Sequence, residues 1–103
     1  MTEERTEQNQ NTRNNNTIFV GNKPLVNYIR GVIAQFTRWG AKEVTIKSRG
    51  KFISRAVDVA EVVKRSIEGK KVVIKSVTIG SEHFDKDGKQ TNVSIMDIVL
   101  AVE

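Results

Sequence analysis

The C-terminal third of the chain most constrains its fold, because two long strand-like runs there flank a hairpin turn. The runs cover Lys71–Phe84 and Gln90–Val102, and Asp85–Lys89 joins them and contains an Asp-Gly pair. Asp-Gly between two such runs is a strong signal for a β-hairpin. Strands of about 13 residues would extend roughly 40 Å, about twice what a compact domain needs. Since Phe84 is the one large apolar residue of Ser81–Asn92, this tip is predicted to project as an arm.

Strand-like and helix-like segments alternate before the hairpin. Thr17–Gly21 is rich in β-branched and aromatic residues and Lys42–Ser48 alternates in polarity, so both are predicted strands. Apolar residues at helical spacing predict one helix from Pro24 to a cap at Gly40 and another over Phe52–Ile67. The order βαβαββ predicts an α/β fold, more closely an α+β sandwich. In it, two helices cover one face of a four-stranded mixed sheet and the hairpin forms an extended arm.

Two apolar surfaces exceed what one such sheet and its helices would cover. The second predicted helix confines its polar residues to a narrow stripe, so its apolar arc is wider than one sheet needs. The final strand is apolar on both faces near its end, with Leu100 and Val102 on one face and Val99 and Ala101 on the other. A second copy of the chain is therefore predicted to cover the remaining apolar surface.

Positive charge is concentrated between Lys23 and Arg55. This segment holds eight bases and a single acid, Glu43, whereas residues 56–103 hold seven bases and eight acids. The first 22 residues hold two bases and three acids. A concentrated basic segment on a small domain indicates a polyanionic partner, of which nucleic acid is the commonest. The alternative is a basic surface that serves only solubility.

Two turns within this segment lead into predicted helices. The first places Lys23 at a helix N-terminus, where free N–H groups and the helix dipole favour a phosphate. Ordinary helix capping is the alternative for that turn. The second carries Lys47, Arg49 and Lys51 at alternate positions, which puts three bases on one side of the chain. Because arginine can bind phosphate with two hydrogen bonds, this turn predicts phosphate contacts.

Composition and motifs give no support for catalysis or metal binding. The chain has no cysteine and a single histidine, His83, so a thiol nucleophile, a Cys-zinc site and a Ser-His-Asp triad are not predicted. The string GNKPLVNY lacks the second Gly-Lys pair of a P-loop. No catalytic residue, metal ligand or cofactor is therefore predicted. A nuclease is the alternative from another class, and it would need acidic residues clustered near the basic surface.

Residues 1–16 contain no apolar residue after Met1, which predicts a disordered polar tail ahead of a nucleic-acid-binding domain at 17–103. The sequence shows no signal peptide and no apolar run of about 18 residues, so no membrane partner is predicted. A cytoplasmic protein associated with the chromosome or nucleoid is expected.

Three strings of the sequence resemble the Alba family of archaeal chromatin proteins. They are IFVGNKPLVNYI, EVTIKSRGKFISRAVDVAEVV and, in the hairpin, DGKQTNVSIMDI. The resemblance covers about residues 17–103, the whole predicted domain, and its long patterns make it specific. It implies a βαβαββ fold and a homodimer that binds double-stranded DNA, and often RNA, largely without sequence preference.

The resemblance also implies which residues contact nucleic acid. In the family these lie in the loop before the first helix, in the I-K-x-R-G turn and on the hairpin arm. The corresponding residues are Lys23, Asn27 and Tyr28; Lys47, Arg49, Lys51 and Arg55; and Lys86 and Lys89. Well-known members have a second lysine where this chain has Asn22, which leaves Lys23 as the candidate for acetylation. Asn92 likewise stands where some members have a basic residue.

We therefore expect a non-enzymatic homodimer that coats or bridges double-stranded DNA, with scope for higher assembly. Its affinity would come from phosphate neutralisation, with the arm along the minor groove. The near alternative is an RNA-binding protein, either an RNA chaperone or a subunit of an RNA-processing ribonucleoprotein. A pure assembly module is a third. No aromatic pair on a predicted strand resembles an RNA-stacking platform, which argues against one mode of RNA binding only.

Overall fold

The computed structural model describes residues 16–103 and contains the predicted order of elements within them. The predicted polar tail lies outside the described residues, apart from Asn16. The elements are β1 (Thr17–Phe19), α2 (Leu25–Thr37), β2 (Glu43–Arg49), the short 3-10 helix η1 (Gly50–Phe52), α3 (Ile53–Ser66), β3 (Val72–Lys86) and β4 (Lys89–Val102). The order βαβαββ is confirmed.

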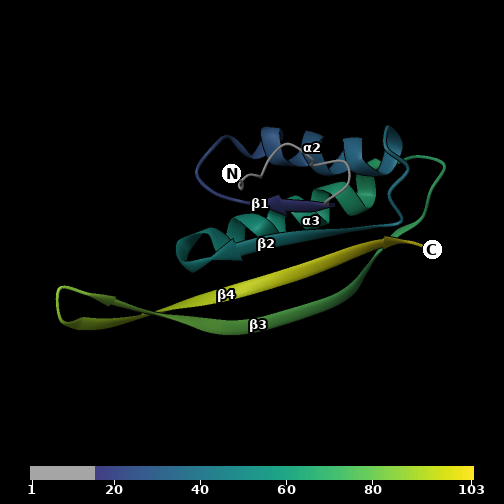
Figure 1. Cartoon of the computed structure of the whole chain (residues 1–103). Helices are drawn as coiled ribbons and strands as arrows, with labels where there is room; N and C mark the ends of the chain where they lie inside the picture. Colours follow the sequence, from purple (N-terminus) through teal and green to yellow (C-terminus); the bar gives the residue numbers. More distant parts are fainter. Residues whose placement is uncertain (1–15) are drawn as a thin grey trace, which may run out of the picture.

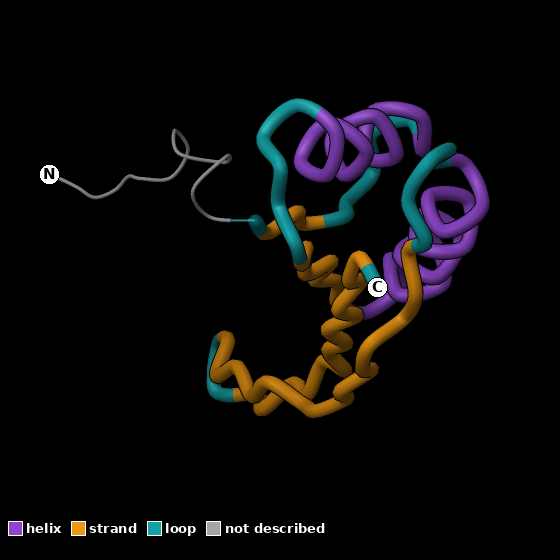
Figure 2. Tube along the Cα trace, turned by 90° about the vertical axis from the view of Figure 1, so that its right-hand side faces the viewer, coloured by secondary structure: helices purple, strands orange, loops and turns teal. Residues whose placement is uncertain are grey.

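The strands form one four-stranded mixed sheet in the order β1-β2-β4-β3. β1 and β2 are parallel, whereas β4 is antiparallel to both β2 and β3. Both helices cover the same face of this sheet (Figures 1 and 2). The predicted fold class is therefore confirmed, and β1 and β3 are the two edge strands.

The core lies between the helices and the covered face of the sheet. Its largest fully buried side chains are Val32 and Phe36 from α2, Val59 and Val63 from α3, Val44 and Ile46 from β2, and Leu100 from β4. Each such side chain contributes about 1.5–3 kcal/mol when it leaves water. The regularly spaced apolar residues from which the helices and β2 were predicted are among the residues that fill this core.

Both ends of α2 are fixed by local chemistry. Pro24 lies at the N-cap with an extended backbone, so the helix begins at Leu25, one residue later than predicted. After the helix, Gly40 has φ +68°, and the Ala41 N–H donates to the Gln35 carbonyl at 2.9 Å. Glycine suits this position because it adopts positive φ without steric cost. The helix itself ends at Thr37 with Arg38 at the C-cap, so the predicted cap residue, Gly40, instead turns the chain just after the helix.

α3 packs against α2 as well as against β2, β3 and β4. This double packing explains why its apolar arc is wider than one sheet needs. Ala56, Val59, Ala60 and Val63 are buried, but Val57 remains partly exposed. Part of the arc is therefore used within one chain, and part is left at the surface.

The hairpin is tighter than predicted. The strands continue to Lys86 and Lys89, so the expected five-residue connection is wrong and the turn consists of Asp87 and Gly88. These two residues have φ +54° and +77°, the combination of a type I′ turn. Pairing of β2 with β4 ends at the Arg49–Ile95 pair. Beyond it the hairpin is a two-stranded arm that projects from the body, as predicted (Figure 1).

The largest group of exposed apolar side chains lies on β3. Val77 pairs with Ile98 and Ile79 with Met96, so both point to the helix side of the sheet, yet they are 52% and 74% exposed. The opposite face of the sheet carries the Lys47–Asp97 ion pair. The leftover apolar surface is therefore at the β3 edge, on the face that the helices only partly cover.

Candidate nucleic-acid interface

The loop between β1 and α2 is held in shape by two side chains. The Lys23 backbone N–H donates to the Tyr28 hydroxyl at 3.1 Å. Arg55 of α3 donates from Nε to the Gly21 carbonyl at 3.0 Å, and its Nη2 donates to the Lys23 carbonyl. A Cβ on Gly21 would lie 3.3 Å from the Tyr28 hydroxyl, so glycine allows this close approach. Tyr28 and Arg55 thus position a loop whose exposed cation is Lys23.

Two predicted phosphate ligands at the end of β2 are paired within the chain. Lys47 Nζ lies 2.8 Å from Asp97 Oδ2 on β4, with both side chains partly exposed. Arg49 Nη1 lies 3.2 Å from Glu82 Oε1 on β3, and its guanidinium lies 5.7 Å from the centre of the Phe84 ring. Arg49 therefore joins the body to the base of the arm.

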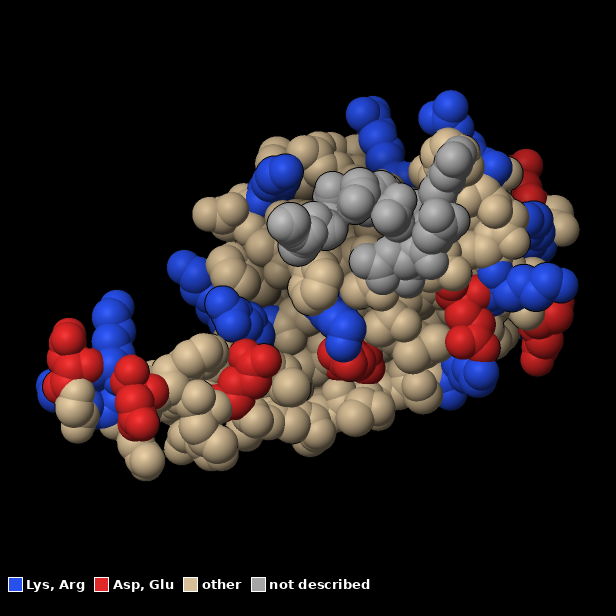
Figure 3. Space-filling view, viewed as in Figure 1, with Lys and Arg blue, Asp and Glu red and all other residues tan. Residues whose placement is uncertain are grey.

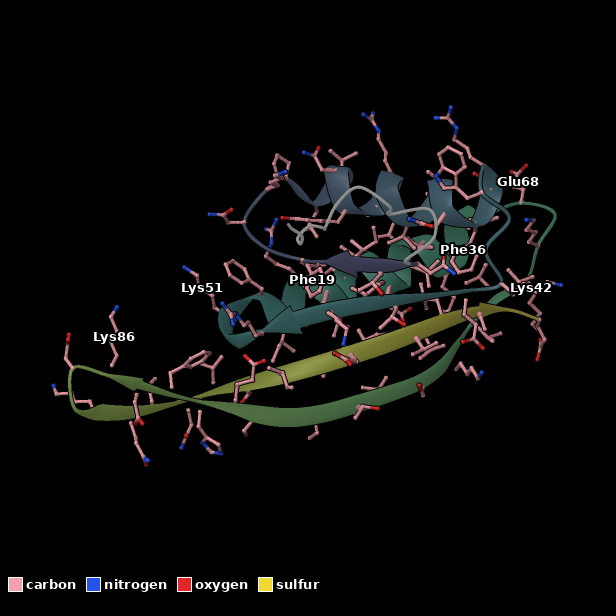
Figure 4. All side chains as sticks on the ribbon, viewed as in Figure 1. Phe19, Phe36, Lys42, Lys51, Glu68 and Lys86 are labelled. Carbon is pink, nitrogen blue, oxygen red and sulfur yellow. The ribbon has the colours of Figure 1, made fainter. Side chains whose placement is uncertain are left out.

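Lys51 and Lys23 differ from these two residues because neither side chain has an ion pair among residues 16–103. Lys51 lies on η1 with its Nζ 5.5 Å from the centre of the Phe52 ring. Figure 4 shows Lys51 pointing away from the body at the end from which the arm extends. These two ammonium groups are available to an external anion without breaking an internal pair.

The remaining predicted site residues lie further out. Asn27 is exposed on the first turn of α2, and its backbone N–H donates to the Pro24 carbonyl at 3.0 Å. Lys86 and Lys89 face each other across the last pair of the arm, beside Asp87. Figure 4 shows Lys86 near the tip of the arm, well separated from Lys51. Body and arm therefore carry separate groups of cations.

An open groove of about 770 Å³ lies where the β1–α2 loop, β2 and the base of the arm meet. Among the predicted residues it brings together Lys23, Tyr28, Lys47 and Arg49. Asn27, Lys51, Arg55, Lys86 and Lys89 do not line it. Glu82 and Asp97 also line the groove, each paired with a cation, so its surface has mixed charge.

Phe19 lines this groove, although the sequence did not predict it as a site residue. It ends β1 opposite Lys47, and 69% of it is exposed. The available signal was the strand alternation, which places Ile18 in the core and Phe19 on the other face. Phe52 also lines the groove, so aromatic rings and cations share this surface.

The basic segment of the sequence does not form one patch. Figure 3 shows Lys and Arg side chains where β2 and η1 end near the arm, but also over α2 and at the opposite end of the molecule. Figure 4 places Lys42 at that opposite end. Seven residues of strand separate Lys42 from the turn after Arg49, which is about 23 Å. Only part of the sequence's charge excess therefore surrounds the groove.

Residues 16–103 contain no group of three or more His, Asp or Glu side chains able to hold a metal ion. No helix among them is long and apolar enough to cross a membrane.

A protein-family model described as Alba matches residues 16–81. The chain belongs to the Alba family. The family resemblance seen in the sequence is thus confirmed. An Alba relative from Methanothrix thermoacetophila, named DNA/RNA-binding protein Alba, is 52% identical over 83 residues, covering 81% of this chain and 91% of the relative. DNA/RNA-binding protein Alba 1 of Archaeoglobus fulgidus is 48% identical over 86 residues, covering 84% and 94%.

The fold agrees with a solved Alba structure. Alba from Thermoplasma volcanium superposes with a TM-score of 0.74 at 36% sequence identity. The match covers 82% of this chain and 98% of that protein. The βαβαββ sheet with its helices on one face is therefore the Alba fold.

Proposed function

We propose that this chain is a DNA- and RNA-binding chromatin protein that coats or bridges double-stranded DNA as a homodimer. The observation that carries the proposal is the groove at the base of the arm, with Lys23 in it and Lys51 on the adjoining η1. The names of the archaeal relatives support it. The proposed nucleic-acid-binding domain is residues 17–103, in the nucleoid of the cytoplasm, and no catalytic step is assigned to it.

The cations have different parts in this proposal. Lys23 and Lys51 bind phosphates directly, since no internal ion pair must break. Lys47 and Arg49 bind phosphate by exchanging Asp97 and Glu82 for it, which costs little because exposed pairs contribute only about 0–1 kcal/mol. Arg55 and Tyr28 hold the loop that presents Lys23.

The outer residues extend the contact. Lys86 and Lys89 lie on phosphates flanking the groove of DNA that the arm follows, and Asn27 donates a hydrogen bond from the start of α2. Acetylation of Lys23 would remove a full charge from the loop and so weaken phosphate binding. Residues that face phosphates bind without reading bases, which fits coating of DNA.

The second copy is proposed to pack on the β3 edge. An open strand edge with exposed apolar side chains favours pairing with another chain. Ile74, Val77 and Ile79 supply this surface on β3, and Val57 lies on the partly exposed arc of α3. A dimer would present two arms and two grooves, as bridging requires.

The test of the proposed function compares a Lys23→Ala/Lys51→Ala variant with the native chain on duplex DNA. Loss of two phosphate contacts should lower the slope of log K against log salt by about 1.8, at ~0.9 per contact. The matched control is Lys42→Ala, a lysine at the opposite end of the molecule. Its slope should stay close to the native value. Equal losses in both variants, or weaker binding with an unchanged slope, would contradict the proposed site.

RNA binding without a chromatin role is the second candidate function. It is supported by the names of the relatives, which are called DNA/RNA-binding proteins. Crosslinking in cells followed by sequencing of bound DNA and RNA separates the two. Broad DNA coverage is expected for the chromatin protein. Recovery of RNA alone would replace it with the RNA-binding candidate.

A further inference from the structure

We propose that Phe19 is a stacking site for an unpaired nucleobase, so that the groove binds a single strand in a different way from a duplex. This inference rests on the proposed function, because it assumes a nucleic-acid ligand. It adds single-stranded nucleic acid as a class of ligand. It also names Phe19 as the residue whose substitution would weaken single-strand binding but not duplex binding.

The position of Phe19 is unusual for a phenylalanine. The ring lies on an edge strand, on the sheet face opposite the core, and is 69% exposed. A phenylalanine left in water gains none of the stabilisation that burial of an apolar ring supplies. The neighbouring Ile18 packs against the core and maintains β1 without it. Folding of the described chain therefore gives no reason for an aromatic ring at this place.

The surroundings of Phe19 match what a nucleotide needs. Phe19 pairs in register with Lys47, and the groove wall also holds Lys23 and Arg49. A nucleotide offers a flat π-face for a ring and an anionic phosphate for a cation. Proteins that bind single strands combine these two features, stacked bases and a cationic groove along the backbone. The shared groove supplies both from adjacent strands.

The geometry favours an unpaired base over a duplex. Bases in a duplex are already stacked on their neighbours, so their faces are closed to a side chain unless the duplex is deformed. A single strand can turn a base out and place it on an aromatic ring. The groove, at about 770 Å³, lies within the range of roughly 300–1,000 Å³ typical of sites for small ligands and so has room for a base. Duplex DNA would instead contact the exposed lysines.

The test measures affinity for three ligands at one salt concentration. They are oligouridine RNA and oligothymidine DNA of about 12 nucleotides, and a DNA duplex. Phe19→Leu keeps apolar bulk and removes the ring, and should weaken single-strand binding by about 5-fold or more, since one stacked base contributes ~1–3 kcal/mol. Duplex affinity should change less than about 2-fold on the same basis. Comparison of the RNA and DNA strands shows whether the sugar matters.

Two further variants make the test specific. Phe19→Trp keeps a stacking ring and should retain single-strand affinity. Trp39→Leu is the matched control, because Trp39 is also exposed and lies 5.7 Å from a guanidinium, that of Arg38, but does not line the groove. It should leave all three affinities unchanged. A single 2-aminopurine in each strand reports stacking directly, and its quenching by the native chain should be lost in Phe19→Leu.

Three outcomes would overturn the inference. Equal losses for duplex and single strands would mean that Phe19 shapes the whole interface rather than stacking a base. If Phe19→Leu binds single strands as tightly as the native chain does, Phe19 does not stack a base. Native binding to the duplex would then still support the proposed function. A change in sedimentation of Phe19→Leu would show that a second copy covers the ring. Absence of binding to every ligand by the native chain would instead refute the proposed function itself.

Discussion

At the scale of single residues, the Arg49–Glu82 pair lies in the wall of the groove that we propose as the phosphate-binding site. The pair spans 3.2 Å between the end of β2 and the base of the arm, and both side chains are about half exposed. We predict that Glu82→Gln raises duplex affinity by about 2- to 5-fold at low salt, because it frees Arg49 and removes a negative charge beside the phosphates. Filter binding or fluorescence anisotropy measures the change.

Glu61→Gln is the matched control, since Glu61 pairs with Lys64 on α3 and does not line the groove. It removes the same charge and should raise affinity much less. Equal gains in the two variants would assign the effect to net charge. Unchanged affinity in Glu82→Gln would show that the pair does not compete with phosphate.

At the scale of elements, the arm is separable from the core. Between Ser81 and Ser94 no residue belongs to the buried core, and β2 pairs with β4 only as far as Ile95. We predict that joining Gly80 to Ile95 through an Asn-Gly turn leaves the melting temperature nearly unchanged but shortens the protected DNA footprint. Six residues of strand span about 20 Å, so each arm should account for about 6 base pairs. Nuclease protection measures the footprint.

A full-length arm with Lys86→Gln and Lys89→Gln separates shape from charge. It should lower the salt slope by up to about 1.8 while it keeps the native footprint. If the shortened arm protects as much DNA as the native chain, the arm does not lie on DNA and the groove alone forms the interface.

At the scale of the whole molecule, we propose that two copies of the chain form a homodimer through their β3 edges. Val77→Asp/Ile79→Asp places charge on the exposed apolar row and should convert a dimer of twice 11.6 kDa into a monomer. Sedimentation at micromolar concentration measures the mass. Bridging of two duplexes should be lost with the dimer, whereas weak binding to one duplex remains.

Val26→Asp on α2 is the control for this prediction, because Val26 is also an exposed apolar residue but lies away from β3. It should remain a dimer. A native chain that sediments as a monomer, or a double variant that stays dimeric, would rule out the β3 edge as the interface.

The helices and strands could be predicted from the amino-acid sequence, because their patterns depend on residues close together along the chain. The hairpin, the glycine turn after α2 and the buried spacing of Val44 and Ile46 could all be predicted from it. The predicted five-residue connection was too long, because the strands continue to Lys86 and Lys89 on either side of Asp87–Gly88. The two turns before the helices predicted Lys23, Lys47, Arg49 and Lys51 as candidate cations, and the family resemblance implied the other site residues, including Asn27, Tyr28 and Arg55.

The partner of each cation depends on the three-dimensional packing of the chain. Lys47 meets Asp97, Arg49 meets Glu82 and Arg55 meets the Gly21–Lys23 loop, and each partner lies more than 30 residues away. Such pairs depend on strand register and helix packing, which no local pattern encodes. The same packing separates Lys42 from the groove and leaves Phe19 exposed beside Lys47. Local sequence patterns therefore predict which residues are candidate ligands. Their ion pairs and their exposure depend on contacts between residues that are distant in the sequence.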